Sequence, residues 1–252
     1  MLHFFWLGLS HFFKAGRFIR KRNLLFFYIL PLVFNVIAFY FLFDWLAVQI
    51  NLLVSLLEQK LNISQLKISK TGHQSINILS KILSFLTKII VFYFSYTIVK
   101  YIILALLSPW FGYISEKTAE IISDKAYPFR LMKIFSDAKR GILLSMRNLI
   151  AEIFFTLFFL ITSLLFPPFA PFAIILNVYI SSYYFGFAMY DYVYERQSLS
   201  ILESLNQANK DKGALLGLGF CMFLCQLIPV IGITIANANG AVAASLHKGQ
   251  NT

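Results

Sequence analysis

Charged residues, and acidic ones above all, are scarce in this sequence. They make up 13% of the 252 residues, with 11 Asp and Glu against 22 Lys and Arg, whereas a soluble globular domain carries about 25% charged residues. Hydrophobic residues account for 59% and are spread along the whole chain. This composition excludes an ordinary soluble domain and predicts a single all-α membrane domain over residues 1–252.

Cysteine is scarce too, and the motifs of common enzyme classes are missing. Cys221 and Cys225 lie four residues apart in an apolar run, so on a helix they share one face, where a disulfide would distort the backbone. We interpret them as small hydrophobic side chains. The sequence contains no nucleophile elbow, no zinc-protease motif and no phosphate-binding glycine loop. It therefore predicts no catalytic residue, no cofactor and no enzyme.

The positive charge falls between the apolar runs. The net charge is +11, and Lys and Arg cluster in the segments that separate apolar stretches, as insertion into a bilayer favours. No zinc spacing or nucleic-acid-binding module accompanies them, so the excess does not indicate a nucleic-acid partner. The four histidines lie near the chain ends or in one loop and predict no metal site: His3, His11, His73 and His247.

Two stretches are predicted to be full transmembrane helices. Residues 24–43 contain no charge over 20 positions, about the length that crosses the hydrocarbon core, and Pro31 is expected to kink this helix. Residues 76–111 form the second span, which should break near Ser108-Pro109 because the residue before a proline disfavours helix. Between the two spans, residues 46–75 are expected to form a short surface helix and a polar loop.

The later apolar segments are interrupted by proline. Residues 149–190 are split within 166–171, and residues 213–246 are split at Pro229 and Gly232. This pattern predicts two proline-turned helical hairpins. The arms of the first hairpin are about 18 residues each, at the lower edge of what spans a bilayer. The hairpins therefore either cross the membrane or span only half of it.

Polar segments complete the predicted domain. Residues 1–22 form an amphipathic helix with an aromatic side and a basic end, which suits the membrane interface. Residues 112–148 carry seven Lys and Arg, so this segment is expected to be cytoplasmic and the N-terminus to lie on the same side. Residues 192–212 should be a polar helix, also cytoplasmic.

Several segments resemble, in their order and spacing, those of one family of membrane proteins. They are Ile29–Leu32 with Asn35 in the first span, Leu107–Lys117 after the second, Phe185–Arg196 before the polar linker, and Gly217–Phe220 with Ile228–Gly232 in the last hairpin. Together they cover nearly the whole chain. The family is that of the CysZ-type sulfate permeases, which share a domain with the eukaryotic etoposide-induced membrane protein.

The resemblance implies two long transmembrane helices and two hairpins that enter the membrane incompletely. It also implies a homo-oligomer in the inner (plasma) membrane, and sulfate uptake. Our leading hypothesis is therefore a multi-pass permease or channel for a small inorganic anion, with sulfate as the first candidate. Membrane lipids are the other expected partner.

One departure from the family pattern bears on the anion site. The sulfate permeases carry Gly-Leu-Arg just before the Leu-Pro of the first span, whereas this sequence has Asn23-Leu24-Leu25-Phe26 there and its arginines lie upstream. A tetrahedral dianion is held by backbone amides at a helix start together with Arg side chains. We predict an anion site at Arg20, Arg22, Asn23 and Leu24. The same residues equally suit an anchor in the lipid headgroups.

Beyond this site, the anion would pass along a polar seam between helices or subunits. Asn35, Asn177 and Tyr179 are candidate donors in that seam, and satisfied packing is the other interpretation of each. The alternative function is a non-transporting membrane scaffold or envelope-biogenesis factor of the same fold, because short hairpins and small-residue helix faces suit assembly as well as transport. A membrane-embedded enzyme is the third alternative.

Overall fold

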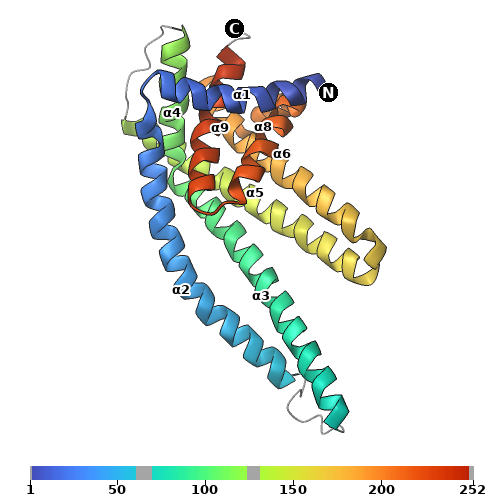
Figure 1. Ribbon diagram of the computed structural model, residues 1–252. Helices are drawn as coiled ribbons and strands as arrows, with labels where there is room; N and C mark the ends of the chain where they lie inside the picture. Colours follow the sequence, from blue (N-terminus) through green and yellow to red (C-terminus); the bar gives the residue numbers. More distant parts are fainter. Residues whose placement is uncertain (1, 61–69, 124–130, 250–252) are drawn as a thin grey trace. The chain divides into compact units, whose positions relative to one another are not determined.

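The computed structural model describes residues 2–60, 70–123 and 131–249, and this part is almost entirely helical with no strand (Figure 1). The long helices are α2 (Ile29–Lys60), α3 (Lys70–Leu106), α5 (Leu131–Leu165) and α6 (Ala170–Arg196). The shorter elements are α1 (Leu2–Lys21), η1 (Leu25–Tyr28), α4 (Ser108–Ser123), η3 (Pro167–Phe169), α7 (Ile201–Lys210), α8 (Lys212–Gln226) and α9 (Ile231–Gly249). The predicted all-α membrane class is confirmed.

Among the described residues, four segments are long and apolar enough to cross a membrane: Leu25–Leu42, Phe85–Leu106, Phe135–Leu165 and Pro167–Arg196. The first two correspond to the predicted spans. The other two are the arms of the first hairpin, which are longer than predicted because the helices continue into polar sequence on both sides.

The first span differs from its prediction at both ends. Residues 25–28 form η1, so Pro31 lies in the first turn of α2, where a proline amide is not needed. Pro31 therefore begins the helix and does not interrupt it. At the other end α2 continues past Asp44 to Lys60, so the separate surface helix expected after residue 46 is wrong. The polar loop expected there falls largely on residues 61–69, outside the described part.

The predicted breaks at proline are confirmed. α3 ends at Leu106 and α4 begins at Ser108. η3 joins α5 to α6, and the second hairpin consists of α8 and α9. The polar linker contains α7, which starts at a Ser200 N-cap in a capping box with Glu203. The two cysteines lie in α8 as free thiols.

The chain forms two compact units, residues 1–36 with 101–252, and residues 37–100. The smaller unit holds the rest of α2 and α3, in which the rings of Phe39 and Tyr96 lie 5.9 Å apart. In the larger unit α9 contacts α1, α4, α6 and α8, and α1 lies across α8 and α9 (Figure 1). The core of this unit is therefore built around α9.

Close backbone contact fixes α1 on α8. A Cβ on Gly8 would overlap the carbonyl of Ala214, and one on Gly217 would overlap the carbonyl of Phe5. Only glycine allows both approaches. The buried face of α1 carries Gly8, His11, Phe12, Ala15 and Ile19. The predicted amphipathic helix is thus present, and it ends beside η1 with its basic residues.

Candidate anion site and buried polar contacts

The chain reverses direction between α1 and η1 through a helix C-cap. The Leu24 amide donates to the carbonyl of Ile19 at 2.9 Å and the Asn23 amide to that of Arg20 at 3.3 Å, the bonding pattern of a Schellman motif. Asn23 occupies its left-handed position with φ of 55°, a conformation that asparagine tolerates. Leu24 and Ile19 are both buried, which supplies the hydrophobic contact of the motif.

These bonds assign structural roles to two of the four predicted anion ligands. The amides of Asn23 and Leu24 already donate to carbonyls within the turn. Any unpaired backbone amides must therefore come from the residues that follow Leu24. The first amides of a helix have no carbonyl partner within it. Because the first bond of η1 runs from Phe27 to Leu24, the amides of Leu25 and Phe26 are the ones that remain available.

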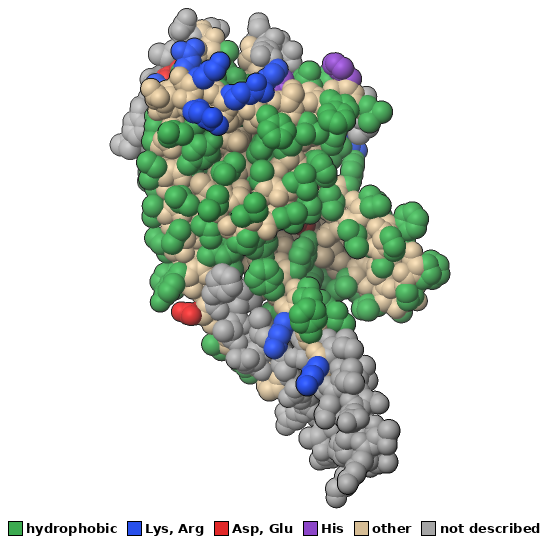
Figure 2. Space-filling model, viewed as in Figure 1, with side chains coloured by type: hydrophobic (Ala, Val, Ile, Leu, Met, Phe, Trp, Pro, Cys, Tyr) green, Lys and Arg blue, Asp and Glu red, His purple; other side chains and the backbone are tan. Residues whose placement is uncertain are grey.

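The other two predicted ligands, Arg20 and Arg22, are exposed. Together with Lys21 they give the segment Arg20–Leu24, here called the basic turn, three positive charges. Figure 2 shows Lys and Arg side chains gathered at the end of the molecule where α1 lies. In the described part of the chain neither arginine side chain has an acceptor. Charge, free donors and solvent access therefore meet at one place.

Polar side chains follow the start of the first span along α9. The Tyr28 hydroxyl donates to Asn239 Oδ1 at 2.6 Å, and the Asn35 amide donates to Thr234 Oγ1 at 2.8 Å. Asn237 is fully buried, and neither atom of its amide has a partner in the described structure. We call these five residues the α9 seam. An unpaired buried amide costs about 1–3 kcal/mol, which a water or a passing solute would offset.

The predicted seam donors do not come together. Asn35 belongs to the α9 seam, whereas Asn177 on α6 accepts from Thr156 on α5 at 2.9 Å. Tyr179 is 41% exposed, and its ring lies 5.8 Å from the ammonium of Lys212. The three residues thus contact three different elements.

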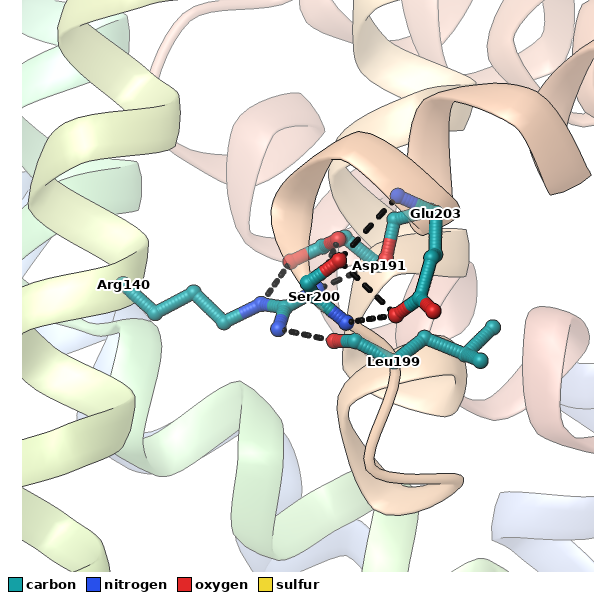
Figure 3. A network of polar contacts seen from close by, with 6 residues as sticks. Arg140, Asp191, Leu199, Ser200 and Glu203 are labelled. Carbon is teal, nitrogen blue, oxygen red and sulfur yellow. Dashed lines mark hydrogen bonds and ion pairs between the residues drawn. The ribbon is translucent and has the colours of Figure 1, made fainter.

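A second polar network ties α5 to the end of α6 and the linker after it (Figure 3). Arg140 donates two bonds to Asp191, Nε to Oδ2 at 2.8 Å and Nη2 to Oδ1 at 2.7 Å. It also donates to the Leu199 carbonyl at 2.6 Å and to Ser204 Oγ at 2.7 Å. Four of its five N–H groups are thereby used, so Arg140 holds the linker and has little capacity left for a ligand.

The same face of α5 continues with buried acidic and amide side chains. Glu152 accepts from the Tyr101 hydroxyl at 2.6 Å and from Ser181 Oγ at 2.8 Å. Asn148, one turn earlier, is fully buried, and its amide has no partner among the described atoms. The acidic side chains of this α5–α6 column are Asp137, Glu152, Asp191 and Glu195. They outnumber its two arginines, Arg140 and Arg147, the second of which lies 5.7 Å from the ring centroid of Phe187 on α6. The excess negative charge of the column disfavours an anion.

Two histidines that the sequence left as isolated residues meet in the core. His11 on α1 and His247 on α9 are both buried, with ring centroids 5.3 Å apart. The Tyr190 hydroxyl lies 2.8 Å from His247 Nδ1. Burial, and then the neighbouring His11, lower the pKa of His247 to about 4. His247 is therefore neutral at physiological pH. Within the described residues no group of three or more His, Cys, Asp or Glu could hold a metal ion.

The family model described as sulfate transporter CysZ/etoposide-induced protein 2.4 matches residues 11–236. The chain belongs to this family. The match runs from α1 into the start of α9 and contains the basic turn, the first hairpin, α8 and the α5–α6 column. The protein is thus a membrane protein of a family described by sulfate transport. No curated protein matches the chain.

Proposed function

We propose that this protein is a permease or channel for a small tetrahedral anion, with sulfate as its substrate. The observation that carries the proposal is the basic turn, where exposed Arg20 and Arg22 lie next to the free amides of η1. A helix N-terminus attracts anions through its unpaired amides and its dipole. Arginine adds paired donors that match the oxygens of a tetrahedral dianion.

The roles of the four predicted residues differ within this proposal. Arg20 and Arg22 contact the anion, whereas Asn23 and Leu24 shape the turn that aims them at it. The amides of Leu25 and Phe26 replace those of Asn23 and Leu24 as backbone donors. This arrangement would take the place of the missing Gly-Leu-Arg sequence.

The α9 seam is the route that fits an anion best. It is made of neutral hydroxyl and amide groups, one of them unpaired. The α5–α6 column carries an excess of carboxylates and would repel a dianion. We further propose that the protein is a multi-pass homo-oligomer of the inner (plasma) membrane, so that seams of neighbouring copies can adjoin.

Radiolabelled sulfate flux into proteoliposomes tests the proposal. We expect saturable uptake that falls about tenfold in Arg22→Ala, since a hydrogen bond to a charged group contributes about 1.5–3 kcal/mol. Arg17→Ala is the matched control, because Arg17 is an exposed arginine upstream of the turn. Absence of saturable flux in the unmodified protein, with no stabilisation by sulfate in detergent, would favour the scaffold function.

A further inference from the structure

A cavity of about 360 Å³ opens between α1, α6 and α8. This volume lies within the range of about 300–1,000 Å³ that is typical of ligand sites. The surface exposed inside is apolar. The side chains that form most of the wall are Leu2, Phe5, Ile175, Val178, Leu216 and Phe220. A cavity of this character suits a hydrocarbon chain and offers nothing to a small inorganic anion.

One cation, Lys212, lies beside the cavity, and a second, Arg147, lies further along α6. Lys212 directly precedes the lining residue Gly213, and its ammonium lies 5.8 Å from the ring centroid of Tyr179, which also lines the cavity. The charges of Lys212 and Arg147 both act on Tyr183, one turn of α6 further on. Within the described residues neither cation forms an ion pair. The positive charge of Lys212 therefore lies beside the cavity without an ion-pair partner among the described residues.

The surroundings of the cavity give a bilayer lipid access to it. α6 is one of the segments able to cross a membrane. The end of α1 that closes the cavity exposes Leu2 and Trp6, and exposed aromatic side chains of this kind favour the membrane interface. An apolar chain inside and a negative group at the mouth would complement both parts of the site.

We propose that this cavity holds one acyl chain of an anionic phospholipid, whose headgroup phosphate contacts Lys212. The lipid would fill the gap between α1 and the α6–α8 pair. It would thereby stabilise α1, the helix that carries the basic turn. The site uses other residues than the proposed anion site, so the two can be tested separately.

Lipid retention by the purified full-length protein in detergent provides the test, read by native mass spectrometry and by the thermal unfolding temperature. Dioleoyl phosphatidylglycerol and dioleoyl phosphatidylcholine share their chains and differ in net charge. We expect the anionic lipid to be retained more tightly and to stabilise more. Lys212→Gln should weaken retention of phosphatidylglycerol about fivefold, the effect of about one Lys–lipid charge interaction, and leave phosphatidylcholine unchanged.

Two further variants test the part of the site that holds the acyl chain, and a third serves as the control. Val178→Phe fills the cavity and should reduce retention of both lipids, and Ile175→Phe does so at a more exposed lining position if the first variant fails to fold. Lys210→Gln, at an exposed lysine of α7, is the control and should behave as the unmodified protein. Equal retention of the two lipids, or a cavity-filled variant that binds as before, would overturn the proposal.

Discussion

Two arginines show what decides whether a cation in this protein is available to a ligand. Arg140 is nearly buried and donates to a carboxylate, a carbonyl and a hydroxyl. Arg22 is exposed at the end of α1. Both residues are basic and both precede a long apolar stretch of the sequence, so the sequence alone does not distinguish them. What makes Arg140 unavailable to a ligand is its hydrogen bonding to residues 51 to 64 positions further along the sequence.

Replacing Arg140 should be strongly destabilising, because it leaves Asp191 buried without its partner. Breaking a buried ion pair on one side costs about 3–5 kcal/mol. Arg140→Ala should therefore unfold at a clearly lower temperature in detergent, and Arg140→Ala with Asp191→Ala should recover part of the loss. Lys139→Ala, at the exposed neighbouring residue, is the control. An unchanged unfolding temperature in Arg140→Ala would show that the network contributes little.

The buried His247 predicts a loss of stability in acid. Its folded pKa of about 4 lies below the value of about 6.5 in the unfolded chain. The unfolded state therefore binds a proton first as the pH falls. The free energy of unfolding therefore keeps its full value above pH ~6.5. It falls by up to ~3 kcal/mol as the pH is lowered towards ~4.

Unfolding temperatures between pH 7.5 and 4.5 check this prediction. His247→Gln should flatten the pH dependence relative to the unmodified protein. His3→Gln, at an exposed position on α1, should retain it. Parallel pH curves for all three proteins would contradict the assigned role of His247.

At the scale of the elements, local sequence signals predicted where helices break but not how far the helices extend. Proline removes a helical hydrogen bond anywhere beyond the first turn, so the turns at Ser108, at 166–169 and before Ile231 could be located from the sequence. Asp44 and Trp45 mark the edge of an apolar run, yet both residues are compatible with helix, and α2 continues to Lys60.

Long-range pairing was the other part that the sequence could not supply. The contact between His11 and His247 joins residues from opposite ends of the chain. A local signal existed for His11 alone: it shares a stripe with Gly8, Ala15 and Ile19, all buried at helical spacing. The charges of the basic turn could be located from the sequence because they are close together in it, whereas its role as an anion site remains a proposal. Which of its amides are free required the C-cap geometry.

The C-cap makes Asn23 a sensitive test of what the basic turn does. Glycine accepts a left-handed conformation freely, whereas a β-branched residue does so at a cost of about 1–2 kcal/mol. Asn23→Gly should therefore retain stability and sulfate flux, and Asn23→Val should lose both. If Asn23→Gly folds normally but loses flux, the Asn23 side chain itself contacts the anion and the role assigned above is wrong.

At the scale of the whole molecule, the polar network around Arg140 constrains the topology. It joins the start of α5 to the linker between α6 and α7, so both must lie on one side of the membrane. Lys139→Cys and Lys210→Cys, at exposed positions in a Cys221→Ala/Cys225→Ala background, should be labelled from the same side by a charged maleimide. Labelling from opposite sides would contradict the network.

The depth of the first hairpin follows from its tip. By length, α5 and α6 can cross the membrane. Yet the residues around the turn are apolar and largely exposed, with Leu164, Leu165, Phe166 and Phe172 each more than half accessible. Placing such a tip in water would expose several large apolar side chains at a cost of about 1.5–3 kcal/mol each. Tilt can absorb the surplus length, so we expect the tip to end inside the bilayer.

A cysteine at the tip distinguishes the two depths. Phe166→Cys in the same cysteine-free background should resist a charged maleimide added to either side, because a thiol in hydrocarbon does not form the reactive thiolate, and should react once the protein is unfolded in detergent. Reaction with the charged reagent from the side opposite to Lys139→Cys would instead show that the hairpin crosses completely. A tip held within the bilayer would leave the α5–α6 column closed to water at one end. That arrangement agrees with a structural role for the column and with an anion route along the α9 seam.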